Sequence, residues 1–102
     1  MPDLPVACTL SPAALRARRE GLFNDLVGRA EHRLDLADGC RLRFAASDDI
    51  LSAIARTVAA ERQCCRFLRF TVTVEPDGGP ILVDLTGPPG TREFLAAMFD
   101  ER

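Results

Sequence analysis

The chain has 102 residues, a length typical of one domain, and its formal net charge is −2. Hydrophobic residues make up 47% and charged residues 27% of the sequence, which excludes an intrinsically disordered chain. The sequence has neither the basic excess that favours nucleic-acid binding nor the apolar run of about 20 residues that spans a membrane. We therefore predict a single domain over 1–102, with no nucleic-acid or membrane partner.

The first ten residues, MPDLPVACTL, lack the basic and long apolar regions of a signal peptide. We therefore expect a cytoplasmic protein, in which the four cysteines stay reduced. Pro2 and Pro5 oppose helix formation, so residues 1–10 are predicted to be an extended lead-in that carries Cys8.

A first helix is predicted from Ser11 to about Ala30. Ser11 is a favourable N-cap, and Pro12 suits the first helical position because its missing N–H would have no partner there. Apolar residues within this stretch recur on one helical face, and arginines and acids cover the remainder.

Residues 32–44 predict a β-hairpin, because leucines alternate with charged residues on both sides of the sequence DGC. A two-residue Asp-Gly turn would place Leu36 opposite a charged residue. A three-residue loop over 38–40 instead places Leu36 opposite Leu42 and makes one face of the pair consistently apolar. We prefer the longer loop, which puts Cys40 at an exposed tip and removes it from the candidate site.

The second half of the chain predicts a helix, a hairpin and a last helix. Ser47 or Asp48 can cap a helix over about 48–67. Alternating apolar residues predict a second hairpin over 70–85, with its turn at Pro76 to Pro80, and Thr91 is expected to cap the final helix. The element order is α-ββ-α-ββ-α. We predict an α+β fold in which two hairpins form one four-stranded antiparallel sheet with helices on one face.

The middle helix carries a carboxylate on the face that should be buried. At about 100° per residue, Glu61 and Cys65 fall within the same stripe as Ile50 and Ile54, and Cys64 lies at its edge. The two cysteines follow Glu61 at the i+3 and i+4 spacings that make helical side chains neighbours. A buried carboxylate is costly unless it is protonated, paired or engaged with other polar groups. Glu61, Cys64 and Cys65 are therefore a candidate site.

Thiols and a carboxylate are a donor set for a soft metal ion. Cys8 is the candidate for a third thiol, because an extended lead-in can lie against the middle helix. Hg(II), As(III) or Cu(I) suits two or three thiolates. Zinc is a weaker candidate, because no CxxC pair is present and His32, the one histidine, is expected to be a solvated strand residue.

Two other functions fit the same cysteines. A redox protein would form a reversible disulfide between Cys8 and either Cys64 or Cys65. An interaction module would bury the cysteines as small hydrophobic side chains, and a homodimer through the exposed sheet face or an edge strand is compatible with the sequence. No catalytic motif identifies an enzyme, and no phosphate loop or CxxCH haem motif occurs.

Three segments, ACTL, ERQCCRFLRF and GGPILVDLTGPPGTREFLA, resemble an uncharacterised family of small bacterial proteins. The family's mark is a Glu-x-x-Cys-Cys-x-Phe motif, matched here by Glu61, Cys64, Cys65 and Phe67, with Cys8 in the first segment. Similar segments occur beside metal-responsive regulators and heavy-metal resistance proteins. The resemblance spans Cys8 to Ala97 and implies soft-metal handling by Cys8, Glu61, Cys64 and Cys65, while Cys40 lies outside the motif.

Overall fold

A computed structural model of the protein describes residues 22–100, apart from the side chains at 22–24, 64 and 100. Its elements are α2 (Leu22–Arg29), β1 (His32–Leu36), β2 (Gly39–Phe44), α3 (Asp48–Cys64), β3 (Arg69–Val74), β4 (Ile81–Thr86) and α4 (Thr91–Asp100). The predicted lead-in over 1–10 and the predicted start of the first helix lie outside the described residues.

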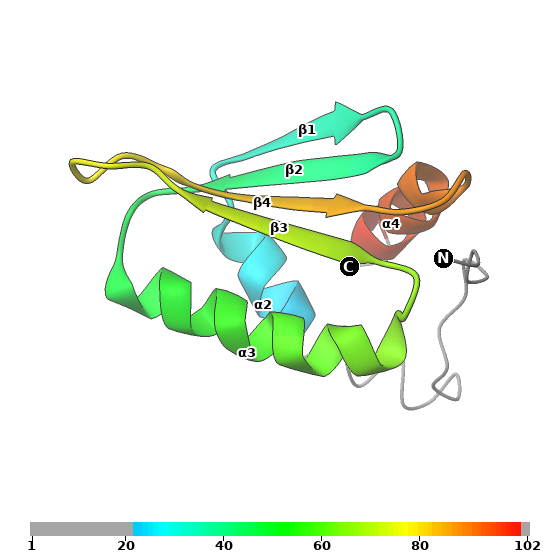
Figure 1. Ribbon diagram of the computed structural model, residues 1–102, viewed down its shortest axis with the longest axis horizontal. Helices are drawn as coiled ribbons and strands as arrows, with labels where there is room; N and C mark the ends of the chain where they lie inside the picture. Colours follow the sequence, from blue (N-terminus) through cyan, green and yellow to red (C-terminus); the bar gives the residue numbers. More distant parts are fainter. Residues whose placement is uncertain (1–21, 101–102) are drawn as a thin grey trace.

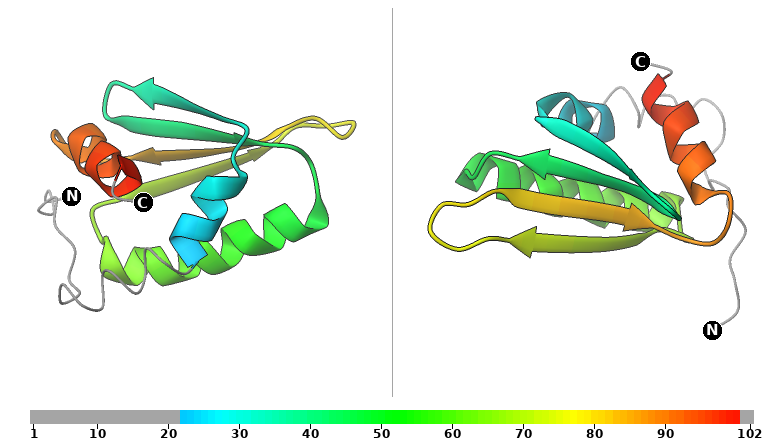
Figure 2. Two further views of the ribbon diagram at one scale, coloured as in Figure 1. Left: turned by 180° about the vertical axis from the view of Figure 1, so that it is seen from behind. Right: turned by 90° about the horizontal axis from the view of Figure 1, so that it is seen from above.

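The four strands form one antiparallel sheet in the order β1-β2-β4-β3 (Figure 1). Figure 2 shows the helices gathered on one side of this sheet. The predicted α+β fold, with two hairpins in one sheet and helices on one face, is confirmed. Within the described part of the chain, no helix has the length and apolar character needed to cross a bilayer.

The core lies between the helices and the covered side of the sheet, which we call the inner face; the opposite side is the outer face. Strands β2 and β4 are central, so their alternate apolar residues meet the helices directly. The buried residues of this core are Leu26, Val27, Cys40, Leu42, Phe44, Ile50, Ala53, Ile54, Ile81, Val83, Leu85, Leu95, Met98 and Phe99.

The second hairpin brings its two predicted apolar faces together. Phe70 pairs with Leu85, Val72 with Val83, and Val74 with Ile81, so each apolar residue faces an apolar partner. On the β4 side these residues are buried, since β4 is central; β3 is an edge strand, and its Val74 is 56% exposed.

The predicted register of the first hairpin is wrong. Leu36 pairs with Gly39 rather than Leu42, so the loop contains only residues 37–38. Cys40 is therefore a strand residue on the inner face, 3% exposed, and not an exposed tip. The leucine at position 34 lies on the outer face with 58% of its surface exposed.

Two contacts explain this register. A Cβ on Gly39 would clash with the Leu85 backbone oxygen, so glycine serves here to let β2 approach β4 closely rather than to form the turn. Strand β1 is an edge strand, and its inner face carries Arg33, whose guanidinium lies 4.8 Å from the centre of the Phe99 ring. A long side chain with a cation–π contact thus covers the core edge where the sequence pattern predicted leucine.

The helix boundaries follow their capping residues. Ser47 caps α3 as predicted, because its hydroxyl oxygen accepts a hydrogen bond of 3.0 Å from the Ile50 N–H. The helix ends at Cys64, earlier than predicted. Thr91 is the first residue of α4 and not its N-cap: its hydroxyl donates to the Pro88 carbonyl at 2.6 Å, while Gly90 accepts the first helical hydrogen bond.

Candidate functional site

Glu61 and Cys65 lie side by side at the end of α3. Their side chains are 2% and 0% exposed, and the Cys65 thiol can donate to the Glu61 carboxylate, with 3.8 Å between Sγ and Oε2. The backbone reinforces this arrangement, because the Cys65 N–H donates to the Glu61 carbonyl at 2.7 Å. The predicted neighbourhood of this carboxylate and thiol on a buried helical face is therefore present.

The apolar stripe of α3 explains why these two polar groups are buried. Ile54, Glu61 and Cys65 share the face that packs toward the sheet, with Val58 partly buried between them. Thr57 is 2% exposed on the same helix, and its hydroxyl donates to the Ala53 carbonyl at 2.8 Å. Thr57 is thus satisfied within its own helix, whereas Glu61 is hydrogen-bonded to a side chain with thiol chemistry.

The chain leaves the helix at the second cysteine. Cys65 is the C-cap residue, with φ −110° and ψ 76°, and the Leu68 N–H donates to its carbonyl at 3.1 Å. Phe67, the aromatic of the motif, is 7% exposed and packs edge-on against Phe94 of α4, with ring centroids 5.1 Å apart. This contact anchors the turn that follows the cysteines, so the thiol-bearing end of α3 is held against α4.

The arginines near the cysteines are all on the surface. Arg62, Arg66 and Arg69 are exposed, so water screens their charges. Their support for a thiolate in the buried site is correspondingly weak, whereas the Glu61 carboxyl group is in contact with the Cys65 thiol.

The remaining predicted ligands fall beyond what the structure describes. Cys8 lies outside the described residues, and so does the side chain of Cys64, although its backbone is the last residue of α3. Among the side chains that are described, no three His, Cys, Asp or Glu residues gather as a metal-binding group. The structure thus brings Glu61 and Cys65 together, and the metal-ligand roles of all four residues stay predictions.

Cys40 has a different environment. It lies in the apolar core on β2, and burial raises the pKa of its thiol from 9.0 to about 11, an effect that Arg33 partly opposes. At neutral pH this thiol is therefore protonated and poorly nucleophilic. The exposed tip that removed Cys40 from the candidate site is therefore wrong, and the thiol is instead part of the core.

A second set of residues was not recognised from the sequence. His32, Arg41, Arg43 and the loop around Pro76 and Pro80 line one cavity on the outer face. The alternation of arginines with apolar residues in β2 indicated a charged face. However, alternation along β2 does not predict how β1 pairs with it, so it does not reveal that His32 lies beside Arg43.

Comparison with known proteins returned no match: no family model, no curated protein and no solved structure matches the chain.

Proposed function

We propose that the protein is a cytoplasmic thiol-based binder or sensor of a soft metal ion. In this proposal Cys8 and Cys64 are ligands, Cys65 is a third ligand or a core residue, and Glu61 is a ligand or a proton acceptor. The observation that carries it is the buried pair at the end of α3, in which the Cys65 Sγ lies 3.8 Å from the Glu61 Oε2.

The chemistry follows from the protonation of thiols. A thiol binds a soft ion as a thiolate, so each sulfur–metal bond replaces an S–H bond and releases one proton. In a desolvated position this proton needs an acceptor, and the Glu61 carboxylate is within hydrogen-bonding range of Cys65. A carboxylate at that position supports metal binding better than the apolar side chain that the stripe would otherwise carry.

The position of the histidine favours Hg(II), As(III) or Cu(I) over zinc. His32 is the only histidine in the chain, and it lines the outer-face cavity, on the side of the sheet that the helices do not cover. It is therefore poorly placed to complete a zinc site at the end of α3. Sulfur ligands alone suit the softer ions.

Titration of the reduced protein tests the proposal. Hg(II), As(III) and Cu(I) are added separately, and accessible thiols are counted after each addition. We expect about one ion per chain, with release of protons in step with loss of thiols. Cys64→Ser, Cys8→Ser and Cys65→Ala should each weaken binding by at least roughly tenfold.

Cys40→Ala is the matched control, because it removes one thiol from the core and leaves the motif intact. Its metal affinity should equal that of the parent. If Cys8→Ser and Cys64→Ser bind as tightly as the parent protein, the metal site does not exist, and the cysteines are structural parts of an interaction module.

Peroxide treatment separates metal binding from redox function. Mild oxidation that links Cys8 to Cys64 or Cys65, reversed by a thioredoxin-type reductant, would support a redox protein instead. We expect that mild peroxide forms no such disulfide, because burial protects the Cys65 thiol from oxidation.

A further inference from the structure

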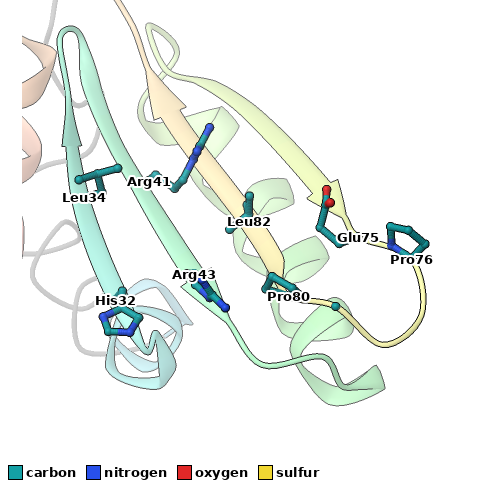
Figure 3. A pocket seen from close by; sticks show the side chains of 9 residues that line it. His32, Leu34, Arg41, Arg43, Glu75, Pro76, Pro80 and Leu82 are labelled. Atoms are coloured by element: carbon teal, nitrogen blue, oxygen red, sulfur yellow. The ribbon is translucent and has the colours of Figure 1, made fainter.

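The outer face of the sheet carries a cavity of about 700 Å³, on the side away from the helices. Its lining comes from β1, β2 and β4 and from the β3–β4 loop (Figure 3). Its lining residues are His32, Leu34, Arg41, Arg43, Glu75, Pro76, Gly79, Pro80 and Leu82. The volume lies within the range of about 300–1,000 Å³ that is typical of small-molecule sites.

The floor of the cavity is built by the register of the central strands. His32 pairs with Arg43, and Arg43 pairs with Leu82, so these three residues form one row across β1, β2 and β4. Pro76 and Pro80 of the β3–β4 loop line the cavity beyond this row. The backbone of the loop is closed by a hydrogen bond of 3.2 Å from the Glu75 N–H to the Pro80 carbonyl. The cavity is therefore framed by hydrogen-bonded backbone.

The two arginines of the cavity differ in their partners. Arg41 makes a bidentate contact with Asp84, with Nε and Nη2 donating at 2.7 and 2.9 Å, and this contact raises the pKa of Arg41. Its charge is thus matched by a carboxylate. Arg43 is exposed, and within residues 22–100 the structure gives it no ion pair. Arg43 is the cation available to an incoming ligand, and the adjacent His32 supplies a second polar group.

The rest of the lining is apolar, with one acid. Leu34 on β1 is 58% exposed, and Leu82 and Pro80, on the other side of β2, are half-buried. Glu75 lies at the far edge of the cavity, next to Pro76 (Figure 3). A ligand that fits must therefore present one anionic group to Arg43 and an apolar body to the leucines, without a second anion near Glu75.

From this arrangement we infer that the outer-face cavity binds a small organic monocarboxylate with an apolar body. Its carboxylate pairs with Arg43, with His32 alongside, and its hydrocarbon portion covers Leu34, Leu82 and Pro80. Glu75 repels a second carboxylate and so selects against dicarboxylates of the same length. The site is on the opposite side of the sheet from Glu61 and Cys65, and the inference does not depend on metal binding.

Hexanoate is a suitable probe, with hexanamide, hexylamine and adipate as matched comparisons. Titration of the ¹⁵N-labelled protein should give saturable shifts at His32, Leu34, Arg43 and Leu82 at millimolar hexanoate. Hexanamide and adipate should bind roughly tenfold more weakly, because the first lacks the charge and the second meets Glu75.

A comparison of two arginine variants tests whether Arg43 binds the carboxylate. Arg43→Gln should weaken hexanoate binding roughly tenfold. Arg69→Gln changes an exposed arginine of β3 that does not line the cavity, and it should leave binding unchanged. Glu75→Gln should bring the affinity for adipate close to that for hexanoate.

Three results would overturn the inference: no saturable shifts with hexanoate, equal binding of hexanoate and hexanamide, or equal loss in Arg43→Gln and Arg69→Gln. Stronger binding of hexylamine than of hexanoate would assign the cavity to cations through Glu75 and would also contradict it. Hg(II) binding by Arg43→Gln should match that of the parent, so failure of this inference is separable from failure of the metal proposal.

Discussion

Neighbouring residues of β2 meet very different surroundings on the two faces of the sheet. Leu42 and Phe44 on the inner face are 1% and 0% exposed, whereas Arg43 between them is exposed on the outer face. The inner face is packed by three helices, and the outer face holds a cavity with a cation that has no ion-pair partner among the described residues. Stability and ligand recognition are thus assigned to alternate positions of the same strand.

The helices that cover the inner face also bury one polar pair. Glu61 and Cys65 lie on the helical face that packs toward the sheet, among apolar residues and Thr57, whose hydroxyl is satisfied within the helix. A polar pair in such a position is more informative than a polar pair on the outer face, because a buried carboxylate must be compensated. The contrast between the faces therefore separates residues that the fold requires from residues that need a chemical explanation.

The largest expected effect is on the inner face. Leu42→Ala removes a fully packed side chain from the centre of the core and should lower the free energy of unfolding by about 3 kcal/mol. Urea denaturation in the presence of a reductant measures this change. A loss below about 1 kcal/mol would show that the inner face is not the main source of stability.

The next effect concerns pH and Cys40. Its pKa is raised to about 11 in the folded protein, above its value of 9.0 when exposed, so the unfolded chain loses this proton first as pH rises. The contribution of Cys40 to the free energy of unfolding is therefore fully present below about pH 9 and is lost as the pH rises from 9 to 11. The total decrease in the free energy of unfolding is on the order of 2 kcal/mol.

The chain is well suited to this measurement, because it contains no lysine and no tyrosine that would titrate in the same range. Urea denaturation of the parent and of Cys40→Ala from pH 7 to 11 isolates the contribution of Cys40. If both proteins lose the same stability over this range, the Cys40 thiol is not desolvated in solution. The same burial predicts that Cys40 reacts slowly with a bulky thiol reagent at neutral pH.

A smaller effect is expected from Glu61→Gln. The variant keeps the side-chain shape and replaces the carboxyl group beside Cys65 with a neutral amide, so the pH profile of Cys65 alkylation should move to lower pH. Peptide mapping after alkylation distinguishes Cys65 from Cys64. A large drop in melting temperature with an unchanged pH profile would instead make Glu61 an architectural residue and remove the main support for the metal proposal.

The smallest effect on stability is expected on the outer face. Leu34→Ala should change the free energy of unfolding by less than about 0.5 kcal/mol, because the side chain is 58% exposed. The same variant should weaken binding of hexanoate more than binding of acetate, which has no apolar body. A change in stability comparable to that of Leu42→Ala would erase the distinction between the two faces.

Much of the fold could be predicted from local pattern. The apolar face of the second hairpin was predictable because Val72 and Val83 belong to apolar alternations on both strands, and an antiparallel pair that brings these alternations together puts them on one face. The buried thiol and carboxylate were predictable too, since the helical period alone puts Glu61 and Cys65 on one face of α3. In both cases the controlling interactions are periodic and lie within a short stretch of chain.

Tertiary structure decided what depends on contacts between distant segments. The first hairpin took its register from the close approach of Gly39 to Leu85 and from the contact of Arg33 with Phe99, both more than 40 residues away in sequence. That register buried Cys40, exposed Leu34 and set His32 beside Arg43. Alternation along β1 specifies which residues share a face, but only the packing of α4 and β4 against the sheet decides which face the core covers.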